Sequence, residues 1–239
     1  MKIPYLLTCT FALTTGGALT AQPGLVGQAD WYQVTSTGVM VNEQHNASTE
    51  ELFATKAKYL PDDWHMGTIE TNEGQQISGY RIRFNLSNRT VEVLSADDLQ
   101  RVVIPGERIK RFTFLKYTRG TEDRTLTAGR EYAVEGVPLT GFVEELVTGD
   151  RSLYLQPGVK VHKANYSVMH DVGSRSDRVT RDDNFYYTLG NDKRSLLPLP
   201  RGRRKLFAIF GEHAKAVAER AQQYAWSPQE REDLTAMFR

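Results

Sequence analysis

Residues 65–85, with the sequence HMGTIETNEGQQISGYRIRFN, contain the pattern that decides the fold. Two runs typical of β-strands, 65–71 and 75–85, flank the polar segment 72–74, NEG, which suits a hairpin turn. In the second run, apolar and cationic side chains alternate: Tyr80, Arg81, Ile82, Arg83 and Phe84. Because neighbouring side chains of a strand point to opposite faces, this alternation predicts an antiparallel sheet with one buried and one wet face.

The second run has one break in its alternation, at Ile77, which is out of phase with Tyr80 and the later apolar residues. Gly79 lies between the two. Glycine adopts the left-handed backbone conformation without steric cost, and an extra residue in a strand often occupies such a position. We therefore predict a β-bulge at Gly79.

Further strand-like runs follow at short intervals, separated by glycine, asparagine and proline. They are residues 89–95, 100–106, 109–117, 129–136, 140–147, 151–156, 159–166, 184–190 and 195–200. The runs 140–147 and 151–156, joined by the segment TGD, predict a second hairpin. Strands at such spacing favour a mostly-β (α+β) fold, either an antiparallel β-sandwich or an open barrel, over βαβ units.

The hydrophobic period changes near Pro200, where helical patterns begin. Two apolar stripes at helical spacing are formed by Leu206, Phe207 and Phe210, and then by Val217, Ala221 and Tyr224. Ser227, Pro228 and Glu230 match a capping box with proline at the first helical position, so a third helix is predicted to begin directly after Ser227. The sequence thus predicts a C-terminal cluster of two or three short helices packed on the sheet.

The N-terminus has the order of a secretory signal peptide: a single charge at Lys2, an apolar core over residues 3–13, and small residues up to Ala21. We expect cleavage after Ala21, which leaves Gln22 as the first residue of the mature chain. A membrane anchor is the competing interpretation. It would need about 18–20 firmly apolar residues, whereas this segment contains several threonines and a Gly-Gly pair.

Cys9, the only cysteine, faintly resembles a lipid-attachment cysteine, but Thr8 stands where such a site needs glycine or alanine. We interpret Cys9 as part of the discarded signal. The mature chain then has no cysteine, which excludes disulfides, a thiol nucleophile and a cysteine-based zinc site. The formal net charge is +1 and becomes zero without Lys2, which gives no general basis for binding nucleic acid. The basic segment 201–205, RGRRK, is interpreted as a solvated helix start.

These patterns divide the 239 residues into four parts. They are a signal peptide (1–21), a partly irregular N-terminal extension (22–60), an antiparallel β domain (61–200) and a helical segment packed on it (201–239). The mature chain has no further candidate transmembrane segment. We expect an exported protein of the periplasm or cell envelope, with an extracellular location as the alternative.

The order of several motifs resembles a family of uncharacterised secreted proteins from Bacteroidota-type Gram-negative bacteria. The motifs are DDWHMGTIETNEGQQISGYRIRFN, ERIKRFTF, GFVEELVTGD, ANYSVMHDVGSRSD, NFYYTLGND and RGRRKLFAIFG, within residues 60–239. The resemblance implies an envelope location and a β-rich body with a helical end, and it carries no activity or catalytic residue. A helical end is unlike the β-rich sorting domains used for export across the outer membrane, which favours the periplasm over the cell surface.

Metal sites are weakly supported. The histidines, at 45, 65, 162, 170 and 213, form no HxH or HExxH pair. Asp171, Ser174, Asp177, Asp182 and Asp183 supply the oxygen ligands that calcium prefers. Their spacing does not match a calcium loop, and interleaved arginines give the carboxylates cationic partners already. We therefore expect neither a metal nor an organic cofactor.

Catalytic patterns are also weak. Glu144 and Glu145 are adjacent, and on a strand they point to opposite faces, so they cannot share a substrate. The paired aspartates at 62–63 and 97–98 occupy turn-like positions. Ser174, in the segment GSRSD, lacks the second glycine and the strand-turn-helix context of a nucleophile elbow. The aromatics Trp31, Trp64, Tyr186 and Tyr187 could form a sugar platform, but core or rim packing is the preferred interpretation, with Phe185 and Tyr187 inward and Tyr186 outward.

The polar stretch 167–183, SVMHDVGSRSDRVTRDD, separates two strands and is longer than most loops inside compact domains. We interpret it as an ordered irregular connection, and as the first candidate for a recognition loop through His170, Asp171, Arg175 and Asp177. The leading functional hypothesis is a non-catalytic binding or interaction protein of the cell envelope, with a protein or glycan partner and an undetermined oligomeric state. The alternatives are an envelope hydrolase with dispersed catalytic residues and a purely structural envelope component.

Overall fold

The computed structural model describes residues 37–41, 57–95, 100–118, 122–163, 178–190 and 192–239. They form a mostly-β fold with short helices at the C-terminal end, as the sequence predicts. The strands are β1 (Val39–Val41), β2 (Tyr59–Thr71), β3 (Gln76–Asn85), β4 (Thr90–Leu94), β5 (Arg101–Pro105), β6 (Ile109–Thr118), β7 (Glu122–Ala128), β8 (Ala133–Val134), β9 (Val137–Pro138), β10 (Phe142–Val147), β11 (Arg151–Gln156), β12 (Val159–His162), β13 (Arg178–Arg181), β14 (Asn184–Leu189) and β15 (Ser195–Pro198). The helices are α3 (Arg203–Ala208), α4 (Ala214–Gln223) and α5 (Arg231–Phe238), with 3₁₀ turns η1 (Gly106–Arg108), η2 (Gly129–Glu131) and η3 (Gly211–His213).

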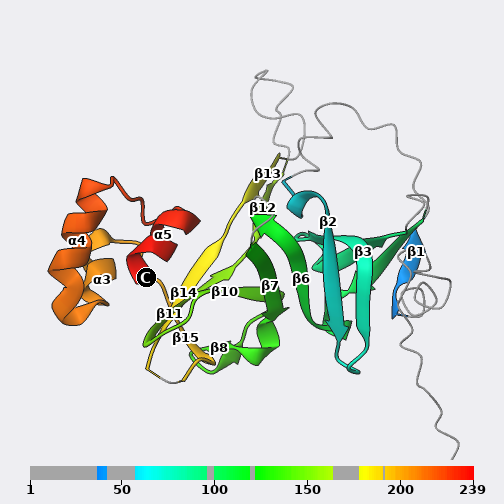
Figure 1. The fold of residues 1–239 in the computed structure, drawn as a ribbon, viewed down its shortest axis with the longest axis horizontal. Helices are drawn as coiled ribbons and strands as arrows, with labels where there is room; N and C mark the ends of the chain where they lie inside the picture. Colours follow the sequence, from blue (N-terminus) through cyan, green and yellow to red (C-terminus); the bar gives the residue numbers. More distant parts are fainter. Residues whose placement is uncertain (1–36, 42–56, 96–99, 119–121, 164–177, 191) are drawn as a thin grey trace, which may run out of the picture.

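Thirteen strands form one sheet in the order β1-β5-β4-β3-β2-β6-β7-β10-β11-β14-β15-β8-β9. Its pairs are antiparallel except for β15 and β8, which run parallel. The end strands β1 and β9 do not pair with each other, so the described sheet is open rather than a closed barrel. β12 and β13 pair only with each other. In Figure 1 this pair stands above the sheet, with the helices grouped at one end.

The hairpin predicted from residues 65–85 forms between β2 and β3. Gly67 pairs with Tyr80 and Thr68 pairs with Ser78, so Gly79 is an extra residue without a partner in β2. The φ angle of Gly79 is 82°, in the left-handed region that glycine tolerates. The bulge brings Ile77 and Tyr80 to the same buried face, which confirms the prediction.

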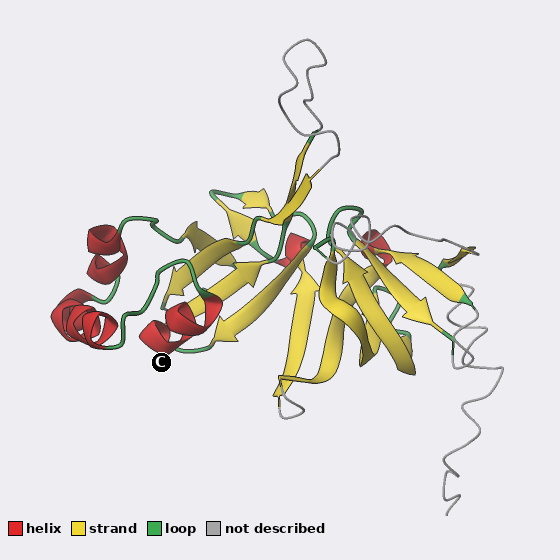
Figure 2. Ribbon diagram, turned by 90° about the horizontal axis from the view of Figure 1, so that it is seen from above, coloured by secondary structure: helices red, strands yellow, loops and turns green. Residues whose placement is uncertain are grey.

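One face of the sheet carries two hydrophobic cores. The first lies within the curl of β2–β7 and β10 and contains a cluster of rings in which Phe112 lies 5.3 Å from Phe84 and 4.8 Å from Phe142. The second joins the same face to the helices and includes Leu153, Leu206, Phe210, Leu234 and Met237. Figure 2 shows the helices beside β10, β11 and β14 at that end of the sheet.

A smaller core covers the opposite face of β10, β11 and β14. Val143, Tyr154 and Leu196 are buried there, against Tyr132 and Val134 from η2 and β8. Burial raises the pKa of the Tyr154 hydroxyl to about 12. The far half of the sheet is therefore covered on both faces, which is why it tolerates strands without clean alternation.

The C-terminal helices confirm one predicted apolar stripe and contradict two other predictions. Leu206 and Phe210 are buried, and Gly211 follows α3 with a φ of 58°. The predicted stripe through Tyr224 is wrong, because this side chain is 61% exposed and stacks on Trp226 at 5.5 Å. Tyr224 follows the last residue of α4, so its side chain does not continue the helical face.

The predicted start of the third helix at Ser227 is also wrong, because α5 begins at Arg231. Glu230 N–H donates to the Ser227 carbonyl at 3.3 Å, which closes a turn in place of the first helical turn. The Ser227 N–H donates to the Asp233 carboxylate at 2.8 Å. Ser227 and Asp233 therefore tie the turn to the helix.

Strand β7 was missed from the sequence. It lies between β6 and β10 in the sheet. Its sequence, EDRTLTA, turns Leu126 and Ala128 into the core, but the third inward residue is Arg124. An inward arginine breaks the apolar alternation by which strands are recognised.

Gly67 provides a test of the packing around the opening hairpin. A Cβ at this position would lie 2.3 Å from Ile82 Cδ1 and 2.7 Å from the Thr113 carbonyl oxygen. We expect Gly67→Ala to lower the free energy of unfolding by about 1–3 kcal/mol, the usual cost of overpacking a core. Urea unfolding measures this. Gly202→Ala, where the new methyl group meets nothing within 4 Å, is the control, and equal losses in both variants would contradict the packing described.

Candidate functional site

The β12–β13 pair, which we call the ribbon, continues two strands of the main sheet. β11 leads into β12 through Pro157 and Gly158, and β13 leads into β14 through Asp182 and Asp183. Asp182 N–H donates to the Gly158 carbonyl at 3.0 Å, and Gly158 N–H donates to the Asp183 carboxylate at 3.0 Å. These bonds hold the bend, so the ribbon leaves the body in a fixed direction.

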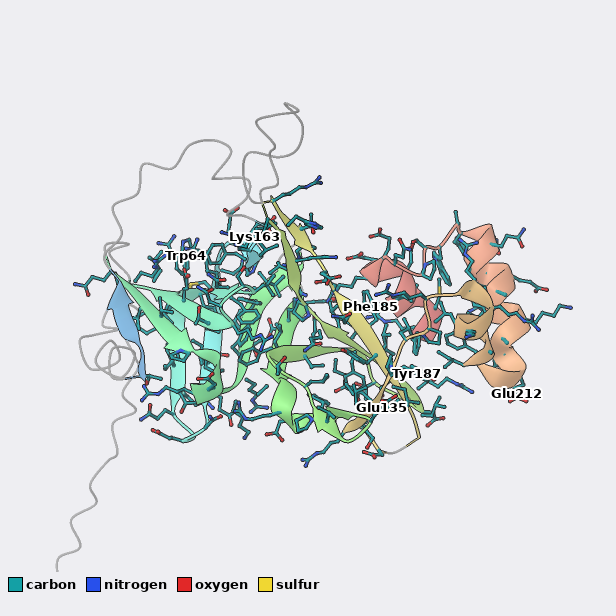
Figure 3. The ribbon with its side chains drawn as sticks, turned by 180° about the vertical axis from the view of Figure 1, so that it is seen from behind. Trp64, Glu135, Lys163, Phe185, Tyr187 and Glu212 are labelled. Carbon is teal, nitrogen blue, oxygen red and sulfur yellow. The ribbon has the colours of Figure 1, made fainter. Side chains whose placement is uncertain are left out.

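The pairing register assigns the ribbon side chains to two faces. His162 lies opposite Arg178 and Lys160 lies opposite Thr180, so these four side chains share one face. The His162 ring lies 3.1 Å from the Thr180 hydroxyl. Within the described residues this face carries cationic and polar groups but no carboxylate. Figure 3 labels Lys163 at the outer end of the ribbon.

The other ribbon face is mixed. Val161 lies opposite Val179, and Val161 is 42% exposed. Val159 packs on the first core and lies opposite Arg181. The Arg181 guanidinium lies 4.0 Å from Asp183 and donates to the Tyr59 carbonyl at 3.5 Å. This face therefore anchors the lower half of the ribbon to β2.

A hollow of about 740 Å³ opens at the foot of the ribbon, and we call it the seam cleft. It is lined by Leu60, Pro61, Asp62, Asp63 and His65 from β2, Arg124 from β7, Leu155 from β11, Arg181 and Asp183 beside the ribbon, Arg231 from α5, and Ala57. The cleft thus gathers charged side chains from four separate stretches of chain.

The floor of the seam cleft is a buried ion network. The Arg124 Nε donates to the Glu144 carboxylate at 2.7 Å, and Arg231 donates to the second oxygen of the same carboxylate at 2.6 Å. The side chains of Arg124 and Glu144 are only 7% and 5% exposed. The Glu144 carboxylate thus lies between two guanidinium groups at the floor.

The network lies between the two cores that share one sheet face. Glu144 is opposite Leu126 on β7 and opposite Leu155 on β11, so these side chains project to the same side. Leu126 belongs to the first core, whereas Leu155 lies opposite Phe185, which packs in the second core. Figure 3 shows Phe185 between the sheet and the helices.

The β2 rim of the cleft is held by a second arginine. The Arg83 guanidinium lies 3.8 Å from the ring centre of Tyr59 and 4.2 Å from that of Trp64, and it also bonds Glu92 at 2.7 Å. Tyr59 donates to Glu92 at 3.1 Å. Burial raises the pKa of the Tyr59 hydroxyl, and the Glu92 charge raises it further. Asp62 and Asp63 lie between Tyr59 and Trp64 in the sequence. They belong to an irregular part of β2 and not to the predicted turn.

All four residues predicted for the recognition loop lie outside the described residues: His170, Asp171, Arg175 and Asp177. The predicted signal cleavage site at Ala21 and Gln22, and the nucleophile candidate Ser174, also lie outside them. One part of the stretch 167–183 is corrected by the structure. Residues 178–181 were expected to be irregular and instead form β13, which pairs with β12 from Val159–Arg181 to His162–Arg178.

An aromatic platform, the alternative to the preferred prediction of core or rim packing, does not form among the described residues, and Trp31 lies outside them. Trp64 stacks on Arg83 in the first half of the sheet. Tyr186 was expected to point outward, but it is half-buried against Tyr154 and Leu196 and donates to Gln156 at 3.1 Å. Tyr186 and Tyr187 are neighbours on β14 and so point to opposite faces. Phe185 packs on the helices, in agreement with the prediction of an inward side chain.

The adjacent glutamates, Glu144 and Glu145, point to opposite faces of the sheet, as predicted. Glu144 is buried in the ion network, whereas Glu145 lies on the opposite face, 3.5 Å from Lys193 and 2.8 Å from the Thr148 hydroxyl. Among the described residues, no group of three or more histidine, cysteine, aspartate or glutamate side chains is placed to hold a metal ion. His65, His162 and His213 lie in the cleft, on the ribbon and in η3, respectively.

Comparison of the chain with protein-family models, with curated proteins and with solved structures finds no match. None of the helices that the structure describes is both long enough and apolar enough to cross a membrane. The chemistry of the site must therefore be argued from its own geometry.

Several residues of the site were missed from the sequence. Arg124, Arg181 and Arg231 are far apart in the chain and have no shared motif. The one available signal was Arg124 itself, a charged residue at an inward position between strand-like neighbours. A buried charge is costly unless it is paired, so such a residue indicates a buried partner. Glu144, opposite it on the next strand, is that partner.

The two adjacent glutamates test the ion network. Glu144→Ala removes the carboxylate that both arginines share and leaves Arg124 buried without it, so we expect the free energy of unfolding to fall by about 3–5 kcal/mol. Glu145→Ala removes only an exposed pair, and we expect a loss below about 1 kcal/mol. Urea unfolding of both variants under identical conditions measures the difference. Similar losses would show that the network contributes nothing beyond an ordinary surface pair.

Proposed function

We propose that the chain is a non-catalytic binding protein, exported to the periplasm or cell envelope, that recognises a protein or glycan partner. We further propose that the ribbon is its recognition element. The observation that carries this proposal is the placement of the ribbon: it pairs with no other strand among the described residues and stands clear of the main sheet, as Figures 1 and 2 show. Envelope residence is part of the proposal and is supported by the signal-peptide pattern and by the resemblance to secreted proteins.

The exposed groups of the ribbon support a binding role. Lys160 and Arg178 place two cations on one ribbon face, and Val161 adds an exposed apolar side chain on the other face. Lys160 and Arg178 have no ion pair within the described residues. An exposed two-stranded ribbon with unpaired cations is a poor contributor to folding stability, since it buries little apolar surface. Its side chains are instead available to a partner.

The anchoring of the ribbon also supports this role. Bonds at Gly158, Asp183 and Arg181 fix its base to the body. A binding element that is already ordered loses less conformational entropy on association, and this raises affinity without new contacts. In the sequence, the stretch 164–177 connects the two strands of the ribbon, and it contains the recognition residues predicted above.

The alternative function, an envelope hydrolase, is favoured by one observation. The seam cleft places His65 with Asp62, Asp63 and Asp183 in a single hollow, which is the residue chemistry of acid–base catalysis. Against it, the guanidinium groups of Arg124 and Arg231 are already bound to Glu144, and Asp183 is bound to the Gly158 backbone. These bonds hold the fold together, and they favour binding over catalysis.

The proposal predicts that a partner is lost when the ribbon loses its cations. The experiment is a crosslinked pull-down from the native cell envelope with the tagged mature protein. We expect the double variant Lys160→Ala/Arg178→Ala to lose the partner that the unaltered protein captures, because both charges lie on one ribbon face.

The matched control is Arg204→Ala/Lys205→Ala, which removes two exposed positive charges from α3. It should retain the partner. Equal capture by both double variants would show that the ribbon is not the recognition element. Failure of the unaltered protein to capture any partner would count against a binding function, and loss of a hydrolytic activity in His65→Ala would establish the alternative.

A further inference from the structure

A second concave surface lies on a different side of the ribbon base, and we call it the Arg89 groove. It consists of two adjoining hollows of about 630 and 290 Å³ that share Arg89, Thr140 and Gly141. One hollow runs along the β3–β4 turn and η1. The other reaches the ribbon base at Pro157, Gly158 and Asp182. The groove is therefore elongated, with Arg89 at its middle.

The local fold directs Arg89 into this groove. The Asn85 side-chain oxygen accepts hydrogen bonds from Ser87 N–H at 3.1 Å and Asn88 N–H at 3.2 Å, which shapes the β3–β4 turn. Arg89 ends the turn with a φ of 56°, and its carbonyl accepts the Gly106 N–H at 3.1 Å. Glycine or asparagine would adopt this left-handed conformation with less strain than arginine.

Gly141 lies beneath the Arg89 side chain. A Cβ at Gly141 would lie 3.8 Å from Arg89 Cδ and 4.0 Å from Arg89 Nε. The stem of the arginine thus passes directly over the bare backbone of Gly141. Among the described residues, the Arg89 guanidinium has no hydrogen-bond or ion-pair partner.

The remaining lining of the groove combines apolar residues and glycines with uncharged polar residues. It presents the side chains of Asn88, Thr90, Thr140, Gln156 and Asn184. Gln156 is held in place, since it donates to the Thr140 carbonyl at 2.5 Å and accepts from Tyr186 at 3.1 Å. Amide and hydroxyl groups of this kind both donate and accept hydrogen bonds, as sugar hydroxyl groups do.

We propose that the Arg89 groove binds an acidic oligosaccharide, with a sugar carboxylate on the Arg89 guanidinium and sugar hydroxyls on the neighbouring amide and hydroxyl side chains. The planar guanidinium matches a carboxylate with two parallel hydrogen bonds. This site goes beyond the ribbon: it is a second ligand site, and its ligand does not need Lys160 or Arg178.

The charges of the groove favour an isolated carboxylate over a phosphate-rich polymer. The other cation of the groove, Arg130, already donates to Asn72 and, at 2.9 Å, to the Ile109 carbonyl. Glu107 lies in one hollow and Asp182 in the other. A dense polyanion would meet a carboxylate of the protein on either side of Arg89, whereas sugars with separated acidic groups would not.

Isothermal titration calorimetry of the mature protein tests this proposal. The probes are short oligosaccharides of galacturonate, glucuronate and alginate type, with neutral maltooligosaccharides of the same length for comparison. We expect at least one acidic probe to bind and the neutral probe to bind at least about tenfold more weakly.

Variants at Arg89 separate charge, geometry and fold. Arg89→Asn keeps a residue that tolerates the left-handed turn, and it should weaken binding at least about tenfold without lowering the melting temperature. Arg89→Lys keeps the charge without the planar guanidinium group, so its affinity for the acidic probe should lie between that of the unaltered protein and that of Arg89→Asn. Arg204→Asn on α3 and the ribbon variant Lys160→Ala/Arg178→Ala should bind as the unaltered protein does. Binding that is unchanged in Arg89→Asn, equal for neutral probes, or absent for every acidic probe would overturn the proposal.

Discussion

The Glu144 carboxylate and the two guanidinium groups that it binds are the interaction on which the rest of the structure depends. Arg124 reaches it from the neighbouring strand and Arg231 from the last helix. Charges this deep are costly unless each finds a partner, so all three groups must be in place together. Their position, where the core of the curled sheet meets the core under the helices, makes the network the polar joint between the two halves of the molecule.

The same joint determines where ligands can reach the protein. The charged groups interrupt the apolar packing at the seam, and the seam cleft opens there. The ribbon rises beside this opening because β11 and β14 continue past the sheet, and Arg181 ties its base to β2. The ribbon, the seam cleft and the Arg89 groove are thus neighbouring features of one end of the sheet, whereas the cores account for stability.

Local patterns were sufficient for much of the fold, because they report on backbone preference and on which face is buried. The alternation after Gly74, the bulge at Gly79 and the opposite faces of Glu144 and Glu145 all followed from such patterns. Long-range charge pairing was not accessible in this way. For this reason β7 was missed: the partner of its inward Arg124 is Glu144, twenty positions later in the chain. The start of α5 was mispredicted for a local reason, since the Asp233 carboxylate accepts the Ser227 N–H and stabilises a turn before the helix. The seam cleft and the Arg89 groove were missed because strand order, which alternation does not reveal, brings their residues together.

Native-state hydrogen exchange of the mature protein and of Arg231→Leu tests the joint most directly. The leucine removes only the helix-side partner of Glu144 while keeping an apolar stem of similar length. If Arg231 ties the helices to the sheet, amide protection in α3, α4 and α5 of the variant will fall well below that of β2, β3 and β6. These strands belong to the first core and will keep the protection that they have in the unaltered protein. An equal loss of protection in helices and strands, or none in either, would contradict the role assigned to the ion network.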